Sequence, residues 1–180
     1  MGFQTPSCPS PIRLSEADAP EIASLYGRCA DYSVLQDGVV PSLADAHELF
    51  TDVPPEKNAH DQTVLGWRCG EDLNAIAALL RDYPCDGTWY LGFMIVDAKL
   101  RGRGLGRSMY AAVETWAATR GATEIRLAVL EANEAGERFW RSLGFGEVRR
   151  LELNRFKLRR HRRIELSRYI GPGFVVGESQ

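Results

Sequence analysis

The sequence predicts a fold of mixed α and β class, and three neighbouring segments carry this prediction. Residues 88–96 form an almost entirely apolar run, as expected for a central strand that is covered on both faces. After the glycine-rich segment 101–106, apolar residues recur at intervals of three and four, which is typical of an amphipathic helix. Residues 124–130 then alternate between apolar and polar, which indicates a second strand.

The first half of the chain is predicted to hold a short strand, two helices and a hairpin. Residues 11–14 have the composition of a strand, and helices are expected over 17–29 and around 42–50 from their helical spacing of apolar residues. The connection 30–41 is polar and is expected to be a loop. Turn residues in the middle of 62–80 predict a hairpin, although the alanines of its second arm leave a helix open there.

The last part of the chain is predicted to add one helix and two strands. Asn133 can cap a helix that Gly144 ends. Strands are expected within 145–156 and 163–170. Since no repeat and no linker divides the sequence, residues 1–180 are expected to form a single domain.

Composition limits the function classes. Hydrophobic residues at 44% and charged residues at 26% are ordinary for a soluble globular protein, and no apolar run approaches the ~18 residues of a membrane helix. The N-terminus lacks the layout of a signal peptide. The four cysteines and three histidines are scattered, which favours reduced thiols and no metal site. We therefore expect a cytoplasmic protein with no membrane partner.

A phosphate-binding site is predicted where the apolar strand leads into the glycine-rich segment. The first N–H groups of a helix have no internal partner and lie at the positive end of its dipole. Glycine lets the backbone approach an anion closely, and Arg101, Arg103 and Arg107 add positive charge. A flexible turn is the alternative interpretation of the same glycines.

Two other phosphate-binding motifs are excluded by their residues. A Walker loop needs Gly-Lys followed by Ser or Thr, and this pair does not occur. The dinucleotide fingerprint G-x-G-x-x-G is also absent, because Arg107 or Met109 stands where its third glycine is required.

Residues 96–106 resemble motif A of the GNAT acetyltransferase superfamily. The core of that motif is Arg/Gln-x-x-Gly-x-Gly/Ala, and Arg101, Gly104 and Gly106 occupy its defining positions. Residues 133–145 resemble motif B of the family, in which an Asn is followed by an aromatic pair and a Leu-Gly-Phe ending. Two motifs in the right order and at the right separation are far more specific than either one alone.

The resemblance is strongest over about 88–146 and looser over the rest of the chain. It implies a twisted, mixed sheet of six to seven strands with about four helices, opened into a wedge between the strand ending at Val96 and the strand ending at Leu130. The pantetheine arm of acetyl-CoA would lie in this wedge, with acetyl-CoA as cosubstrate and no metal. The coenzyme-binding residues implied are Met94, Ile95, Val96, Arg101, Gly102, Arg103, Gly104, Leu105, Gly106, Arg107, Asn133 and Trp140.

The activity implied is transfer of an acetyl group to an amine of a small molecule or peptide, by direct attack in a ternary complex. A main-chain N–H near Ile95 or Val96 would stabilise the oxyanion. A CoA-binding regulatory module without catalysis is the alternative, because Trp140 stands where many relatives carry a catalytic Tyr. Tyr90 stands where some relatives carry a catalytic Glu, so the general base is unassigned.

Candidates for the acceptor side lie in two loops. We expect an Asp to recognise a cationic amine and a Tyr to relay its proton, with an ordinary capped loop as the alternative. The residues concerned are Asp31, Tyr32, Asp82 and Tyr83.

The charge distribution is uneven. Residues 1–80 hold 4 Lys and Arg against 12 Asp and Glu, whereas residues 149–168 hold 9 against 2. The basic segment could border the CoA phosphates, bind RNA, or form a solvated hairpin. We favour the hairpin over a nucleic-acid partner, because Phe156 is the one aromatic residue among the arginines. A homodimer that forms through the last strand is a further alternative.

Overall fold

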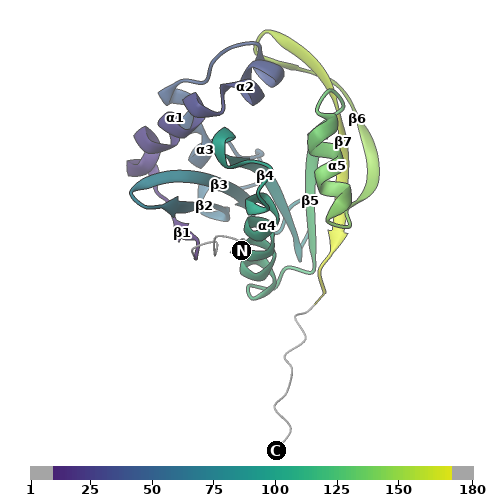
Figure 1. Ribbon diagram of the computed structural model, residues 1–180. Helices are drawn as coiled ribbons and strands as arrows, with labels where there is room; N and C mark the ends of the chain where they lie inside the picture. Colours follow the sequence, from purple (N-terminus) through teal and green to yellow (C-terminus); the bar gives the residue numbers. More distant parts are fainter. Residues whose placement is uncertain (1–9, 172–180) are drawn as a thin grey trace, which may run out of the picture.

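The computed structural model describes residues 10–171 and confirms the mixed α and β fold. One seven-stranded sheet has the order β1-β2-β3-β4-β5-β7-β6, in which β4 and β5 are parallel and the other neighbours are antiparallel (Figure 1). The strands are β1 (Ile12–Arg13), β2 (Gln62–Cys69), β3 (Asp72–Leu80), β4 (Thr88–Val96), β5 (Glu124–Leu130), β6 (Gly146–Phe156) and β7 (Arg159–Tyr169). The α-helices are α1 (Ala19–Arg28), α2 (Ala30–Asp37), α3 (Leu43–Thr51), α4 (Leu105–Ala118) and α5 (Glu134–Ser142).

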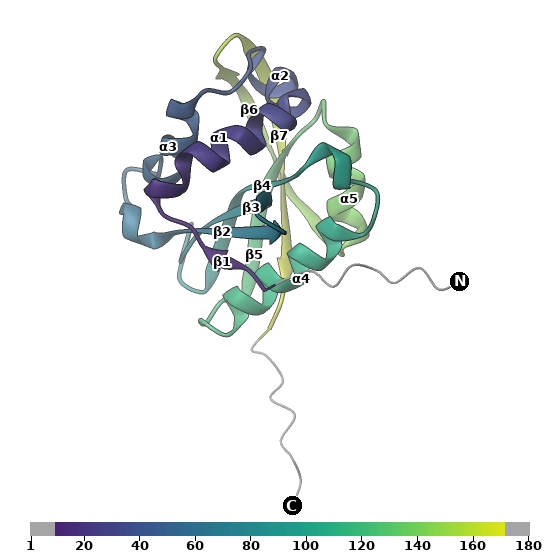
Figure 2. The same ribbon diagram turned by 60° about the vertical axis from the view of Figure 1, so that its left-hand side comes forward.

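Two apolar cores cover the two faces of the sheet. One core joins α4 to the sheet through Met109, Tyr110 and Val113, and the other joins α1 through Ile22 and Leu25. Alternate residues of β3 enter opposite cores, as the pleat of a strand requires. The helices accordingly form two groups, α1 to α3 and α4 with α5, as Figure 1 and Figure 2 show.

Strand β4 has the bounds predicted from its apolar run and is the centre of the fold. Trp89 and Leu91 pack in the core under α4, whereas Ile95 packs in the core under α1. Burial on both faces explains why the run lacks the alternation of an edge strand.

The sheet splits between β4 and β5. The two strands pair only over Thr88, Trp89 and Tyr90, and beyond this point their backbones are not bonded to one another. A register shift in the β3–β4 pairing leaves Gly92 as an extra residue on β4. Such a bulge bends a strand and increases its twist, which accounts for the divergence of β4 from β5.

The predicted loop over residues 30–41 is wrong, because α2 occupies most of it. This helix is short and polar, and Ser33 is its only buried residue among those described. It has no apolar stripe that sequence periodicity could detect. Gly38, which ends the helix in the left-handed conformation at φ 76°, was the available signal.

The other element predictions hold with small differences. The helix expected over 17–29 begins as a 3-10 turn and continues as α1. The first strand is only two residues long, and α2 raises the number of α-helices in the described residues from the expected four to five. Among these helices none is long and apolar enough to cross a membrane.

A buried ion pair fixes α1 to the end of β4. Arg28 Nε donates to Asp97 Oδ2 at 2.6 Å, and Asp97 is only 4% exposed. Asp97 Oδ1 also accepts the N–H of Lys99 at 3.0 Å. Burial alone would raise the pKa of Asp97, but these hydrogen bonds outweigh it and lower the pKa. The ionised carboxylate therefore stabilises the folded chain.

We predict that Asp97→Asn lowers the free energy of unfolding by about 2 kcal/mol at neutral pH. Since the pKa is lower in the folded state, this contribution is complete above the unfolded-state pKa of about 3.9 and is lost as the pH falls below it. Urea unfolding at neutral and acidic pH measures the effect. A difference between wild type and variant that stays constant down to about pH 3 contradicts the assignment. Glu21→Gln, which removes the exposed pair with Arg68, is the control.

Candidate functional site

The split leaves one edge of β4 without backbone partners. Asp97 N–H donates to Asn74 O at 2.8 Å, so the backbone of Asp97 faces β3. Because backbone groups alternate sides along a strand, those of Val96 and Met94 face the split, and those of Ile95 face β3. The Val96 carbonyl accepts Arg101 Nε at 3.0 Å. The N–H of Val96, rather than that of Ile95, therefore points toward the split.

The glycine-rich segment holds a row of unused amides at the start of α4. Gly102 and Gly104 have φ values of 75° and 83°, which glycine alone adopts without strain. A Cβ at either position would meet nothing within 4 Å, so the space beside both is open. In the described part of the chain, none of the amides of residues 102–107 donates a hydrogen bond. This geometry fits a diphosphate group.

Gly106 has a different role. A Cβ at this position would lie 3.3 Å from the ring of Phe139, so the small residue allows α5 to pack closely against α4. The two sequence motifs therefore meet at this contact.

The arginines of the segment have different partners. Arg101 pairs with Asp31 through Nη1–Oδ2 at 2.5 Å and Nη2–Oδ1 at 3.2 Å. The hydrogen bond from Arg101 lowers the pKa of Asp31. Arg107 donates to Ser142 at 3.2 Å. Arg103 is exposed and makes no hydrogen bond to another described residue.

Asn133 of motif B caps α5, and Trp140 lies within this helix. The side chain of Asn133 caps α5 by accepting the N–H of Gly136 at 3.0 Å, as predicted for a capping residue. Trp140 packs edge-on against Phe139, Tyr110 and Phe145, with ring centroids 4.9 to 5.8 Å apart. Its ring is part of the core wall, and an indole has no group that titrates usefully.

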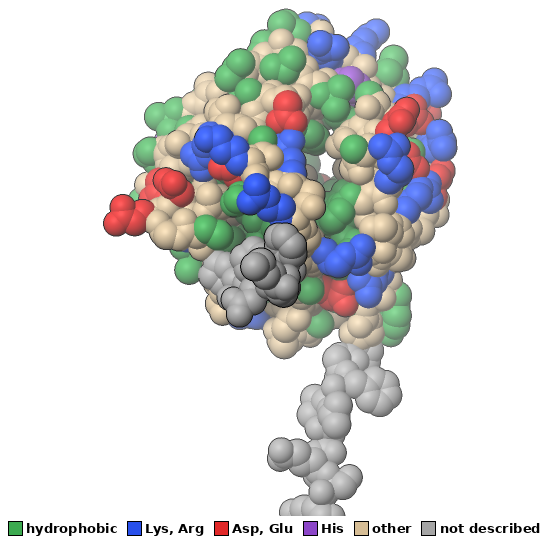
Figure 3. Space-filling model, in the orientation of Figure 1, with side chains coloured by type: hydrophobic (Ala, Val, Ile, Leu, Met, Phe, Trp, Pro, Cys, Tyr) green, Lys and Arg blue, Asp and Glu red, His purple; other side chains and the backbone are tan. Residues whose placement is uncertain are grey.

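A cavity of about 560 Å³ lies on the opposite face from α4. It is lined by α2 and α3, by β4 beyond its pairing with β5, and by the β6–β7 hairpin. Figure 3 shows an opening through the molecule between the part that contains β4 and the part that contains β5. The lining includes Tyr90, Gly92 and Phe93 of β4, so the cavity reaches the split strand. The volume suits a small molecule or the end of a chain.

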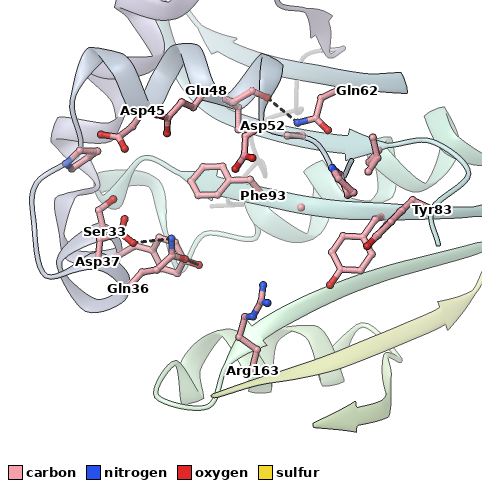
Figure 4. A pocket seen from close by; sticks show the side chains of 18 of the residues that line it. Ser33, Gln36, Asp37, Asp45, Glu48, Asp52, Gln62, Tyr83, Phe93 and Arg163 are labelled. Carbon is pink, nitrogen blue, oxygen red and sulfur yellow. Dashed lines mark hydrogen bonds between the residues drawn. The ribbon is translucent and has the colours of Figure 1, made fainter. Parts of the chain in front are cut away.

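The cavity is polar and unevenly charged. Carboxylates of α2 and α3 lie on one side, and Arg163 of β7 lies on the other (Figure 4). Asp45 is paired with Lys157. Burial would raise the pKa of Asp45, but hydrogen bonds from Lys157 and Ser42 lower it to about 2. No three His, Cys, Asp or Glu among residues 10–171 are grouped to hold a metal ion.

Glu165 is the most buried carboxylate of the cavity, at 3% exposed. Its Oε2 accepts Arg149 Nε at 2.8 Å, and no other described side chain bonds to Oε1. Glu165 was not among the residues predicted from the sequence, because a Glu between Ile164 and Leu166 on an alternating strand is expected to face solvent. A carboxylate in this position can accept a proton.

Four tyrosines line the same cavity: Tyr26, Tyr32, Tyr83 and Tyr90. Tyr32 donates its hydroxyl to Gln36 Oε1 at 2.8 Å, and its ring lies edge-on to Phe93 at 6.1 Å. Tyr83 lies edge-on to Tyr90 at 5.7 Å. Burial raises the pKa of Tyr32 and of Tyr90 to about 12, so both are protonated at neutral pH. They can donate hydrogen bonds, but the raised pKa makes them weaker acids than an exposed tyrosine.

The structure separates the residues proposed for the acceptor side. Tyr32 and Tyr83 line the cavity, whereas Asp31 and Asp82 do not. Asp31 is turned to Arg101, and Asp82 accepts the N–H of Gly87 at 3.0 Å, which is the structural role of a loop cap. None of the acids that do line the cavity was predicted from the sequence; they are Asp37 of α2, Asp45 and Glu48 of α3, Asp52 just after α3, and Glu165 of β7.

The basic segment forms the predicted hairpin, β6 and β7. It is not wholly solvated, however, because Arg149 and Arg163 line the cavity. The hairpin lies against α2, where Leu158 N–H donates to Asp37 O at 3.0 Å and His161 Nε2 lies 3.0 Å from Leu35 O.

Comparisons with known proteins agree with this geometry. The family model described as the acetyltransferase (GNAT) family matches residues 24–145. No curated protein sequence matches the chain. Among solved structures, an acetyltransferase from Thermus thermophilus is similar with a TM-score of 0.71 at 18% identity, covering 93% of this chain and 99% of that one.

Two further structures carry more specific names. The ribosomal-protein-S18-alanine N-acetyltransferase from Escherichia coli has a TM-score of 0.68 at 18% identity, over 94% of this chain and 97% of that one. The ribosomal-protein-alanine N-acetyltransferase from Brucella melitensis has a TM-score of 0.66 at 19% identity, over 88% and 98%. At such identities the similarity concerns the fold alone. With the family model covering more than half of its length, the chain belongs to the GNAT acetyltransferase family.

Proposed function

We propose that the protein is an acetyl-CoA-dependent N-acetyltransferase whose acceptor amine enters from the cavity between α2, α3 and the β6–β7 hairpin. The observation that carries this proposal is the split between β4 and β5, because it has unused amides of residues 102–107 at one end and the polar cavity on the other face. The two substrates would therefore meet across the sheet. We also propose a cytoplasmic location, which the three free thiols in the described residues support.

The coenzyme side is built from backbone groups. The amides of residues 102–107 would hold the diphosphate, with Arg103 and Arg107 beside it. The open edge of β4 at Met94 and Val96 would pair with the amide groups of the pantetheine arm. Acetyl-CoA would supply the acetyl thioester at this edge.

The chemistry requires three residues of the chain. Glu165 would accept a proton from the acceptor amine, which is then nucleophilic enough to attack the thioester carbonyl. The N–H of Val96 would stabilise the oxyanion that forms. The departing thiolate would take the second proton of the attacking nitrogen, and Tyr32 would donate a hydrogen bond to the thiolate, because its hydroxyl is protonated at neutral pH and its ring lies against Phe93 next to the open edge. These assignments replace the tyrosine that Trp140 cannot supply.

We predict that Gly104→Glu raises the Kd for CoA at least about 10-fold. The added carboxylate would occupy the space beside Gly104 and repel the diphosphate. Titration calorimetry with CoA measures the change. Gly121→Glu is the matched control, because Gly121 also has a positive φ, at 96°, and open surroundings, but lies at the other end of α4. Equal affinity in both folded variants would remove the diphosphate site from the loop.

We predict that Glu165→Gln lowers kcat by about 10²- to 10⁴-fold and leaves the affinity for CoA unchanged, because the amine loses its proton acceptor. Thiol release from acetyl-CoA with an active amine measures kcat. Glu124→Gln is the control, since Glu124 is paired with Arg126 at 3.0 Å in the same sheet but does not line the cavity. Full turnover by Glu165→Gln would leave the base unassigned.

We predict that Asp31→Asn raises the KM for acetyl-CoA by about 3-fold and changes the KM for the amine less. Asp31 holds Arg101 against the end of β4 and does not reach the cavity. Steady-state kinetics with each substrate varied in turn separates the two constants. Glu147→Gln, which breaks exposed contacts with Arg141 and Arg150, is the control. A larger effect on the amine would return Asp31 to acceptor recognition.

A further inference from the structure

Arg163 enters the cavity wall with its hydrogen-bonding capacity unused. Among the described residues its side chain forms no hydrogen bond and no ion pair, and its Nε is shielded from solvent without a partner. The guanidinium lies 5.3 Å from the ring centroid of Phe156, which supports it. Figure 4 shows the side chain directed from β7 toward Phe93. A charged group left unpaired in such a position is costly unless a ligand completes it.

The opposite wall has the reverse charge. Asp45 and Glu48 lie on one face of α3, Asp52 follows at the C-terminal end of that helix, and all three line the cavity (Figure 4). Asp45 is neutralised by Lys157, but Glu48 and Asp52 have no ion-pair partner among the described residues. Asp37 of α2 adds a carboxylate that accepts only a bond from Gln36, at 3.4 Å. The cavity is therefore negative at the helices and positive at Arg163.

Arg163 and Glu165 lie on the same face of β7. Residues two apart on a strand are about 7 Å apart, and both line the cavity. If Glu165 accepts the proton of the reacting amine, an anionic group on that amine's own carbon would lie within reach of Arg163. The carboxylates of Asp45, Glu48 and Asp52 lie across the cavity from Arg163 (Figure 4).

We propose that the acceptor is an α-amino acid with a cationic side chain, whose carboxylate binds Arg163, whose α-amine reacts beside Glu165, and whose side-chain cation binds the acidic face of α3. This assignment rests on the proposed function and narrows its substrate class. One guanidinium matches one carboxylate in a planar, two-bond geometry. A phosphate would bring more charge than Arg163 can neutralise beside Glu165.

The proposal separates this protein from enzymes that act on a polypeptide N-terminus. In a polypeptide the carbon next to the amine carries a neutral amide, which offers Arg163 no charge. Lysinamide models that end of a chain, whereas free lysine carries the carboxylate. The two molecules differ in this one group.

The experiment compares four acceptors in thiol release from acetyl-CoA: L-lysine, lysinamide, 1,5-diaminopentane, which lacks the carboxylate, and L-norleucine, which lacks the side-chain cation. We expect kcat/KM for lysine to exceed each of the others at least about 10-fold, which corresponds to about 1.4 kcal/mol. Mass spectrometry of the product should show acetylation at the α-amine. Arg163→Gln should remove the preference over lysinamide and diaminopentane, and Glu48→Gln with Asp52→Asn should remove the preference over norleucine.

Arg162→Gln is the matched control, because Arg162 is exposed on the other face of β7 and does not line the cavity. It should keep every preference. Equal rates with lysine and lysinamide in the wild type would overturn the inference and favour a polypeptide acceptor, while the acetyltransferase activity itself would stand. A preference that survives Arg163→Gln would also overturn it. If none of the four amines accelerates thiol release but another amine or a peptide does, the acceptor assignment fails and the proposed function stands. If CoA binds and no amine or peptide of a wider panel accelerates release, both fail.

Discussion

The fold depends on a sheet that stops pairing in its middle. Strands β4 and β5 are bonded over three residue pairs and then diverge. Backbone N–H and C=O groups inside a protein are almost always paired, so an open edge at the centre of a sheet must be completed by solvent or by a ligand. The bulge at Gly92 produces this edge, and the cores on both faces hold the strands apart. Every other feature of the site is arranged around the resulting opening.

The two sides of the opening use different kinds of group. On the side of α4 the unused groups are main-chain amides, whose position is fixed by helix geometry and by the glycines. On the cavity side they are side chains from α2, α3 and β7, which can differ between proteins of one fold. Backbone recognition suits a cosubstrate shared by a whole family, and side-chain recognition suits an acceptor that varies. This difference explains why the family is clear while the acceptor must be argued from single residues.

The coenzyme side of the site could be predicted from the sequence, whereas the cavity side could not. Local patterns identified β4, the glycine segment, α4 and the cap at Asn133, because each depends on residues close together in the chain. The cavity joins α3 to β7, which are more than a hundred residues apart, and no local pattern reports that Asp52 and Arg163 line the same cavity. The contact between Asp31 and Arg101 could not be predicted for the same reason, since the two residues are seventy positions apart.

Helix α2, which the sequence predicted as a loop, has residues on both sides of the opening. Asp31, in its first turn, holds Arg101 at the glycine segment, while Tyr32, Ser33 and Asp37 face the cavity. One short helix therefore positions residues toward both substrates. Polar contacts at its two ends, to Arg101 and to the β6–β7 turn, and the packing of Tyr32 against the core fix the place of α2. A loop of the same composition could not hold a carboxylate and a hydroxyl in fixed relation across the split.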